Sequence, residues 1–279
     1  MILLSFIVLS IVASLVQSAD TNPPLRIGAF NVQIFGVTKM SKENVPTIIA
    51  EIVTRYDVML LQEIRDVTGT AIAELLEMVQ ALNSNYQYVI SERLGRSSSK
   101  EQYAFFYRSD LVKIMSTYQY GDSTDVFERE PYCVELEPFN SGKFFGVCGI
   151  HMKPSDVVNE LTGLVDVYDT LMNAPFSSKN LILMGDFNAE CSYLSATKLN
   201  ENPLYTDSQY HWLISSDVDT TTKTSDCAYD RIIISGDVLE EAFISNSAMT
   251  YRYDLDFELD ETTTTDVSDH YPVEASFQF

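Results

Sequence analysis

The sequence predicts a layered α/β fold, with mixed β-sheets inside and helices outside. Three observations predict it. Apolar runs of strand length recur along the chain, amphipathic helical stretches separate several of them, and strand-like runs joined by short turns fill residues 86–151. Alternating strands and helices are typical of layered α/β packing, whereas consecutive strands with short turns pair antiparallel. We therefore expect sheets that contain both kinds of pairing.

Strands and helices alternate in the amino-terminal third of the chain. The expected elements are strands over residues 25–32 and 58–61 and helices over residues 45–53 and 72–82. Each helix has apolar side chains at a spacing of three and four residues, which gives it one apolar face. Ser41 is a suitable N-cap for the first helix, and Asn83 closes the second. The second strand ends at Gln62-Glu63.

The central and carboxy-terminal parts contain more strands than helices. The expected strands lie near residues 86–92, 103–108, 111–119, 131–137, 143–151, 181–184, 229–235 and 270–277. A helical stripe of apolar residues over 161–172 is the one clear helix here, and it is expected to face the core. The wholly apolar run 181–184 predicts a strand buried on both faces.

The chain is strongly acidic. It has 18 basic and 40 acidic residues, for a formal net charge of −22. Such a chain repels a polyanion unless cations intervene, which argues against a module that binds nucleic acid by electrostatics alone. An enzyme that needs a divalent metal and a locally basic face fits better. Candidates for that face are Arg65, Arg93, Arg96, Lys100, Arg129, Lys153 and Arg231.

Residues 1–18 form an uncharged apolar stretch, which small residues and then polar residues follow. This pattern predicts a secretory signal peptide, and a membrane anchor is the alternative. No other stretch is long enough to span a membrane. We therefore expect a secreted, extracellular protein without a membrane-bound part, in which residues 19–279 form a single domain.

Four cysteines in a secreted chain suggest two disulfides, with three possible connectivities. Cys133 and Cys148 lie in two strand-like runs whose intervening turn would place them directly opposite each other, near enough to bridge. We expect the pairs Cys133 with Cys148 and Cys191 with Cys227. Buried thiols at 133 and 148 are the alternative.

Polar residues gather at the ends of the strand-like runs. They are Asn31, Gln62-Glu63, His151, the segments 185–188 and 229–231, and Ser268-Asp269-His270. Carboxylates, carboxamides and imidazoles at strand ends suit a metal-assisted attack of water on a phosphodiester. Glu63 follows a buried strand, where a lone carboxylate is costly unless it meets solvent or a cation, so we expect it to bind a metal. Asn31 would add a neutral oxygen.

Two of the three histidines stand at strand boundaries beside carboxylates. Imidazole is well suited to proton transfer near neutral pH. Asp230 could orient His270, and Glu101 could orient His151. A single histidine is more often structural than catalytic, and we expect His211, next to Trp212, to be structural.

Eight motifs in order resemble the secreted deoxyribonuclease I family of the endonuclease/exonuclease/phosphatase superfamily. They are LRIGAFNVQIFG, LLQEIRD, SERLGRSSSKEQYAF, YQYGD, FEREP, MGDFNAECSYL, DCAYDRIII and SDHYPVE, and they cover essentially all of residues 19–279. The resemblance implies a four-layer α/β sandwich of two mixed, mostly antiparallel sheets. It also implies endonucleolytic cleavage of double-stranded DNA that leaves 5′-phosphate ends, with catalytic Mg²⁺ or Mn²⁺ and structural Ca²⁺.

The resemblance also implies roles for single residues. Glu63 would hold the metal, with Asn31, Asp186 and Asp269 near it. His270 with Asp230 would activate water, and His151 with Glu101 would protonate the leaving 3′-oxygen, although the sequence alone leaves the two roles interchangeable. The residues implied to contact phosphate or DNA are Arg65, Arg129, Asn188 and Tyr193. Contacts to phosphates and to the minor groove carry little base information, so weak sequence preference follows.

The chain departs from the family pattern at several positions. Ser99 replaces a tyrosine that packs in the minor groove, and Gln33 replaces a basic residue. One implied calcium loop retains Asp122 and Asp125 but is short and lacks the family's small disulfide. The other retains Asp219 and Thr221 but puts Lys223 at a ligand position, where only a backbone carbonyl could serve.

The sequence also indicates which partners and which alternative functions to consider. We expect a monomer that acts on double-stranded DNA. Some family members bind monomeric actin, but here Ile90 and the bulky Tyr132 occupy the corresponding surface, so actin binding is not the favoured expectation. The alternatives are a phosphatase or sphingomyelinase-like phosphodiesterase of the same superfamily, and a catalytically silent DNA- or actin-binding module. The intact set of histidines and carboxylates disfavours a silent module.

Overall fold

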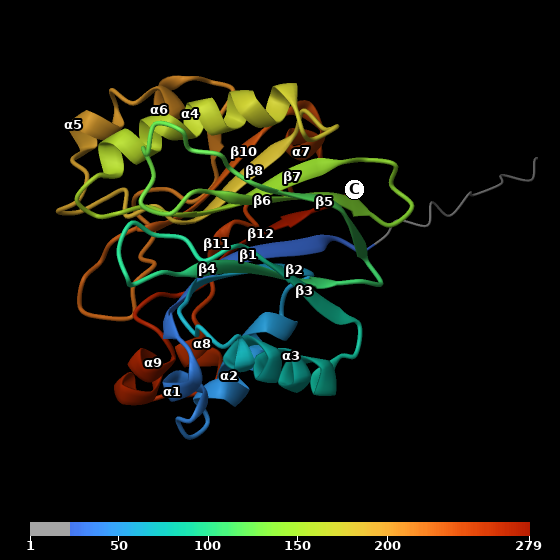
Figure 1. The fold of residues 1–279 in the computed structure, drawn as a ribbon, viewed down its shortest axis with the longest axis vertical. Helices are drawn as coiled ribbons and strands as arrows, with labels where there is room; N and C mark the ends of the chain where they lie inside the picture. Colours follow the sequence, from blue (N-terminus) through green and yellow to red (C-terminus); the bar gives the residue numbers. More distant parts are fainter. Residues whose placement is uncertain (1–22) are drawn as a thin grey trace, which may run out of the picture.

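Two six-stranded sheets packed face to face form the centre of the protein. The computed structural model describes residues 23–279, and the expected signal peptide over residues 1–18 lies outside them. Helices cover the outer face of each sheet, so the layers run helices, sheet, sheet, helices (Figure 1). The predicted four-layer α/β sandwich of mixed sheets is confirmed.

The first sheet places a parallel pair among antiparallel neighbours. Its strands are β1 (Leu25–Phe35), β2 (Val58–Ile64), β3 (Tyr86–Ile90), β4 (Gln102–Arg108), β11 (Met249–Thr250) and β12 (Val273–Phe277), in the order β11-β12-β1-β2-β4-β3. β1 and β2 are parallel because the chain crosses over between them through the helices α1 (Val37–Met40) and α2 (Val45–Thr54). All other pairs in this sheet are antiparallel.

The second sheet repeats the same plan. Its strands are β5 (Val112–Gln119), β6 (Tyr132–Pro138), β7 (Phe145–His151), β8 (Leu181–Asp186), β9 (His211–Trp212) and β10 (Asp230–Ser235), in the order β5-β6-β7-β8-β10-β9. The parallel pair is β7 and β8, which the helix α4 (Val157–Asn173) connects. The polar carboxyl ends of both parallel pairs carry Asn31 and Gln62 in one sheet and His151 and Asp186 in the other.

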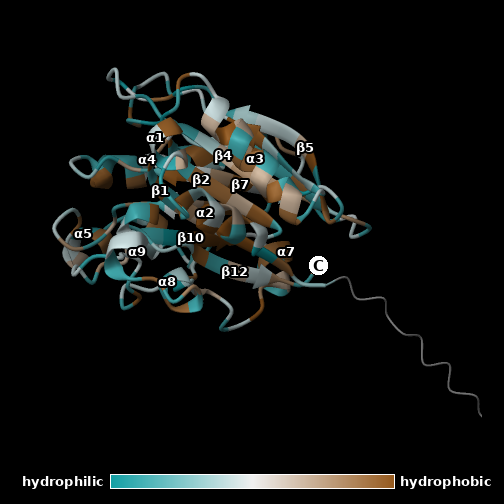
Figure 2. Cartoon of the chain, turned by 90° about the horizontal axis from the view of Figure 1, so that it is seen from below, coloured by the Kyte–Doolittle hydropathy of each residue, from teal (hydrophilic) through white to brown (hydrophobic). Residues whose placement is uncertain are grey.

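Apolar side chains fill the three spaces between the four layers. One core lies between the sheets, and another lies between the first sheet and the helices α1, α2, α3 (Thr70–Leu82), α8 (Tyr253–Asp256) and α9 (Glu261–Val267). The third lies between the second sheet and the helices α4, α5 (Ala196–Leu199) and α6 (Pro203–Thr206). The remaining helix, α7 (Asp237–Ala242), adds buried side chains to the core between the sheets. Figure 2 shows hydrophobic colouring on the inner strands and on parts of the helices that pack on them, whereas the loops are coloured more mixed, with many hydrophilic segments.

Three details of the fold differ from the sequence-based expectation. Consecutive strands do not all pair, because the chain leaves the first sheet after β4 and enters the second at β5. Ser41 closes α1 instead of capping α2, whose N-cap is Asn44 in the left-handed conformation, with a proline in the first turn. The short helices α5 to α9 carry too few turns for a periodic pattern to predict them.

Both predicted disulfides are present. Cys133 and Cys148 face each other in the register of β6 and β7, and their Cα atoms are 4.0 Å apart. Cys191 and Cys227 join the loops that follow β8 and precede β10. Within residues 23–279, no helix has the length and apolar character needed to cross a membrane.

Candidate active site

The predicted site residues meet at one end of the sandwich because strand ends from both sheets lie there. Asn31 and Glu63 belong to β1 and β2, and His151 and Asp186 end β7 and β8. Asp230 begins the neighbouring strand β10 opposite Asp186. Glu101 stands just before β4, and His270 lies in the loop before β12. The site therefore forms across the interface between the two sheets, from residues that are up to 239 positions apart.

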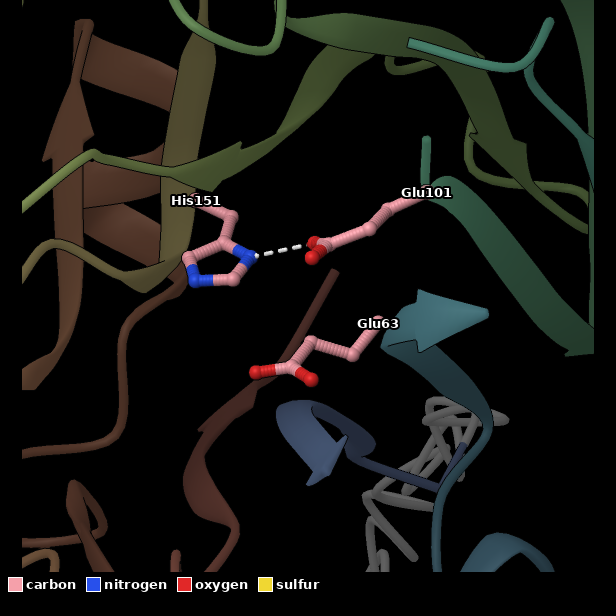
Figure 3. Close-up of side chains that lie close together, drawn as sticks. All are labelled: Glu63, Glu101 and His151. Atoms are coloured by element: carbon pink, nitrogen blue, oxygen red, sulfur yellow. Dashed lines mark hydrogen bonds and ion pairs between the residues drawn. The ribbon is translucent and has the colours of Figure 1, made fainter. Parts of the chain in front are cut away.

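His151 and Glu101 form the first pair (Figure 3). The imidazole Nδ1 lies 2.9 Å from Glu101 Oε2, and both residues are buried. Burial raises the pKa of Glu101, but His151, Arg129 and Arg65 outweigh burial and bring that pKa to about 2. Glu101 therefore stays a carboxylate, which favours a proton on His151 Nδ1 and leaves Nε2 free for chemistry.

His270 and Asp230 form the second pair. His270 Nδ1 lies 2.7 Å from Asp230 Oδ2, and the Asp230 side chain is fully buried. Burial raises the pKa of Asp230 above that of an ordinary aspartate. Burial alone would lower the pKa of His270, but the carboxylates of Asp230 and Asp186 raise it. Ser268 supports the geometry, because its hydroxyl donates to the Asn31 carbonyl and accepts from the His270 backbone N–H.

Asp186 lies where the two pairs converge. Its Oδ2 is 3.5 Å from His151 Nε2 and 3.7 Å from His270 Nε2. The two imidazoles thus turn their free nitrogens toward one point from different sides. Such a pair can remove a proton from a nucleophile and donate a proton to a leaving group in the same reaction.

The carboxylates around this point fit a divalent cation. Asn31 Nδ2 lies 3.2 Å from Glu63 Oε1 and 3.1 Å from Asp186 Oδ2, so these two carboxylates border the same small space. Asp269 Oδ1 lies 3.8 Å from His270 Nε2. Carboxylate oxygens are the ligands that Mg²⁺ and Ca²⁺ prefer. Asn31 could add its oxygen to this site only if its side-chain amide rotated by half a turn. In this structure its Nδ2 faces the carboxylates, and its Oδ1 accepts the Gln33 N–H at 3.0 Å.

Gln62 connects the two sheets beneath the site, a role that the sequence analysis missed. Its Nε2 donates to the Ile150 carbonyl, and its Oε1 accepts the Asp186 N–H at 3.0 Å. Gln62 can reach the Ile150 carbonyl because Gly185, which lies beside that carbonyl, has no side chain. A Cβ on Gly185 would lie 2.3 Å from the Ile150 carbonyl oxygen and would block this contact. The signal was present in the sequence, since a residue next to Glu63 on a strand must point to the opposite face.

The four residues implied to contact DNA surround the site. Arg65 Nη2 bonds to Glu63 Oε2 at 3.0 Å and Glu101 Oε1 at 2.8 Å. Arg129 Nε donates to the His151 carbonyl at 3.1 Å. Asn188 is buried and donates to the Met152 carbonyl, and its backbone N–H bonds to Asp186. Tyr193 is 42% exposed and packs on Tyr229, whose ring centroid is 6.4 Å from that of His270.

The implied calcium ligands bond to groups of the protein in this structure. Asp122 accepts the Phe127 N–H, and Asp125 pairs with Arg96 at 2.9 Å. Asp219 accepts the N–H and the hydroxyl of Thr221. Across residues 23–279, neither pair belongs to a group of three or more carboxylate, imidazole or thiol ligands.

Lys223, at the implied ligand position of the second loop, pairs instead with a residue of the active site. Its Nζ lies 3.1 Å from Asp269 Oδ2. Its ammonium group therefore already compensates part of the negative charge beside His270.

Glu160 on α4 is a buried carboxylate beneath the His151 side of the site. Its Oε1 accepts the backbone N–H groups of Glu128 at 3.1 Å and Lys153 at 3.3 Å, whereas its Oε2 is buried without a hydrogen-bond partner. Burial raises the pKa of Glu160 to about 7, against the lowering effect of those N–H groups and of Arg129. The folded protein therefore binds this proton more readily than the unfolded chain does.

We predict that Glu160→Gln stabilises the protein at pH 8. Between the unfolded pKa and about 7, the folded state binds more protons, so the stability from this group is fully present at acidic pH and falls as pH rises. The variant should remove that fall, which amounts to at most about 3 kcal/mol. Urea unfolding of both proteins between pH 5 and 8 measures it. Equal pH dependence in the two proteins would show that Glu160 titrates normally.

Comparisons with known proteins found a matching family and several relatives. A sequence model described as the endonuclease/exonuclease/phosphatase family matches residues 28–270. Deoxyribonuclease-1 of Equus caballus is 40% identical over 259 residues, which are 90% of this chain and 92% of the relative. Deoxyribonuclease-1 of Rattus norvegicus is 36% identical over 277 residues, 97% of each. Deoxyribonuclease-1-like 2 of Mus musculus is 39% identical over 256 residues, 91% of this chain and 92% of the relative.

Solved structures share the architecture at much lower identity. The human Nocturnin catalytic domain superimposes with a TM-score of 0.62 at 20% identity, covering 92% of this chain and 95% of that one. A Bacteroides thetaiotaomicron mannosyl-6-phosphatase superimposes with a TM-score of 0.61 at 15% identity, covering 91% and 100%. Likeness at this level shows the fold alone, because one fold can carry several chemistries.

Proposed function

Since this chain belongs to the deoxyribonuclease I group of the endonuclease/exonuclease/phosphatase family, we propose that it is a secreted, divalent-metal-dependent endonuclease that hydrolyses DNA and leaves 5′-phosphate ends. One observation carries the proposal. Two histidine–carboxylate pairs from different sheets turn their free nitrogens toward Asp186 Oδ2, at 3.5 and 3.7 Å. This is the arrangement that proton transfer at both ends of a phosphodiester substitution requires.

In the proposed reaction, the two histidines divide the proton transfers. His270, oriented by Asp230, takes a proton from the attacking water. His151, oriented by Glu101, donates a proton to the leaving 3′-oxygen. Each carboxylate fixes the tautomer of its imidazole through Nδ1 and stabilises the charged form. The result is a 5′-phosphate on one product and a 3′-hydroxyl on the other.

A catalytic Mg²⁺ or Mn²⁺ would be held by Glu63 and Asp186, with Asp269 and a rotated Asn31 nearby. When bound, the cation would supply positive charge that neutralises the phosphate and offsets the carboxylates that raise the pKa of His270. Structural Ca²⁺ is proposed at two loops, one with Asp122 and Asp125 and the other with Asp219 and Thr221. In the first loop, Asp125 would have to leave Arg96 to bind it.

The substrate is proposed to be double-stranded DNA, cleaved with little sequence preference. Arg129 and Asn188 would hold the scissile phosphate, Tyr193 would touch the backbone, and Arg65 would enter the minor groove. None of these contacts reads a major-groove base edge, where the four base pairs differ most. With a net charge of −22, binding should depend on these few cations and on metal ions.

Secretion and partners are proposed from the same set of features. The apolar segment 1–18 is proposed to be a signal peptide, with residues 19–279 as one nuclease domain. The two disulfides fit an oxidising, extracellular setting. We propose a monomer, and leave actin binding as an outcome for direct measurement.

The test is nicking of supercoiled plasmid by the disulfide-bonded protein. We predict relaxed circles in Mg²⁺ and Ca²⁺, none in EDTA, and 5′-phosphate ends that a ligase can rejoin. The comparison protein is Asp230→Asn, which retains the shape of the site but loses the buried charge that orients His270. Absence of nicking by the folded protein, or nicking that persists in EDTA, would refute the proposal. Hydrolysis of a sphingolipid phosphodiester instead would favour the alternative substrate class.

A further inference from the structure

A cavity of about 400 Å³ opens beside the His151 side of the active site. It is lined by Arg65, Arg96, Ser97, Ser99, Glu101, Glu128, Arg129, Lys153 and Pro154. Three of these residues belong to the site already described, since Glu101 bonds to His151 and both Arg65 and Arg129 lie against Glu101, at 2.8 and 3.6 Å. The cavity therefore continues directly from the place where the scissile phosphate is proposed to bind.

Cations outnumber carboxylates in this cavity, although the chain as a whole is acidic. Four of its residues are arginine or lysine and two are glutamate, in a protein with 18 basic and 40 acidic residues. A local positive field on an acidic protein attracts anions to that one place. Guanidinium and ammonium groups are also the usual partners of phosphate.

Glu128 holds the far side of the cavity together. Its Oε2 accepts Lys153 Nζ at 2.8 Å and lies 3.9 Å from Arg96 Nη1, and its Oε1 accepts the Arg96 backbone N–H at 3.2 Å. Burial raises the pKa of Glu128, but Lys153 and the Arg96 N–H lower it further than burial raises it. Glu128 is therefore the counter-ion of Lys153 and a second, more distant carboxylate beside Arg96, whose Nε also pairs with Asp125 Oδ1 at 2.9 Å.

The backbone beneath these side chains is fixed. Glu160 accepts the N–H groups of Glu128 and Lys153 with the same oxygen, so it ties the segment before β6 to the segment after β7. Those two segments carry Glu128, Arg129 and Lys153. Lys153 keeps a partly exposed side chain, so it can turn from Glu128 to a ligand without moving the chain. Arg96 is also partly exposed and can approach the same ligand through Nη1 while its Nε stays on Asp125.

We propose that this cavity binds a second phosphate of the cleaved DNA strand, next to the scissile one, with Lys153 and Arg96 as its ligands. The inference rests on the proposed nuclease function and names a subsite within it. On binding, the phosphate replaces Glu128 as the partner of Lys153 and of Arg96 Nη1, while Arg96 Nε keeps Asp125. Glu128 thus weakens binding in the free enzyme, and its removal strengthens binding.

The test compares variants on DNA and on bis(4-nitrophenyl) phosphate, an ester with a single phosphate. For each variant, kcat/KM on DNA is divided by kcat/KM on the ester. We expect Lys153→Gln to lower this ratio several-fold and to reduce the slope of log kcat/KM on DNA against log salt by about 1, as loss of one phosphate contact predicts. We expect Glu128→Gln to raise the ratio and to make the slope steeper.

The controls separate this subsite from charge and from folding. Lys179→Gln removes an exposed lysine just before β8 and so changes the net charge equally. Lys153→Arg keeps the charge and should keep the ratio. Equal ratios for Lys153→Gln and Lys179→Gln, or a fall in the ratio for Glu128→Gln, would overturn the subsite. Wild-type protein that cleaves the ester but not DNA would overturn the nuclease function and the subsite together.

Discussion

Replacing His270 by alanine should lower DNA cleavage by roughly 10³- to 10⁴-fold, which is the upper range for loss of a general acid or base. Asp230→Asn should lower it to a comparable extent, because a neutral amide can stabilise the wrong tautomer of His270 and cannot stabilise its charged form. The physical reason is burial: Asp230 is fully enclosed, so no water can replace its charge. Single-turnover cleavage of a duplex oligonucleotide measures both effects.

Alanine variants of the two histidines, each assayed on DNA and on an ester with a stable leaving group, distinguish the roles of His151 and His270. An acid that protonates the leaving oxygen becomes dispensable when the leaving group is already stable as an anion, such as 4-nitrophenolate. We therefore expect His151→Ala to lose much less activity on bis(4-nitrophenyl) phosphate than on DNA, whereas His270→Ala loses as much on both. The reverse pattern would exchange the two roles. Full activity of both variants on DNA would remove the histidine pairs from the mechanism.

Glu63→Gln should reduce DNA cleavage by about 10²-fold or more and raise the Mg²⁺ concentration needed for half-maximal rate. Glutamine has the same size as glutamate, but its one oxygen can accept only one of the two hydrogen bonds that Glu63 now receives from Asn31 Nδ2 and the Ile34 N–H. It lacks the negative charge that a divalent cation requires. The readouts are the rate as a function of Mg²⁺ and the binding of Mn²⁺, followed by paramagnetic resonance of the protein without DNA.

Glu51→Gln is the matched control for the Glu63 variant. Glu51 is an exposed residue on α2, so its neutralisation changes the net charge of the protein but not the site. The Glu51 variant should unfold within about 0.5 kcal/mol of the wild type, because Glu51 is an exposed surface residue. Far-UV circular dichroism of the Glu63 variant checks that it is folded before its Mn²⁺ binding is measured. Unchanged Mn²⁺ binding by Glu63→Gln would place the cation on other residues.

Short-range patterns were sufficient for much of the fold. The apolar runs that end at Gln62 and Asp186 could be recognised because buried strands need continuous apolar sequence. The hairpin pairing of Cys133 with Cys148 followed from a turn of known length. Where several local solutions compete, sequence reasoning failed: Ser41 is a good N-cap, but Asn44 and the proline after it start the helix.

Contacts between distant segments could not be predicted in the same way. Nothing local separates β4 from β5, yet the chain changes sheets there because each sheet must bury its inner face against the other. The support that Gln62 gives to Asp186, and that Glu160 gives to the segments around Arg129, crosses from one sheet or layer to another. The sequence shows that Gln62 and Glu160 are polar residues, but it does not show which groups they bind.

The sequence by itself determined the residue types of the active site and their position at strand ends, because strand period and buried apolar runs are local properties of the chain. Only the tertiary structure decided how they combine. It turned both histidines toward Asp186, directed the Asn31 amide nitrogen to the carboxylates, paired Lys223 with Asp269, and placed Glu128 against Lys153. These arrangements depend on how two sheets pack and on which charges then share a desolvated space, and neither is encoded within a single segment.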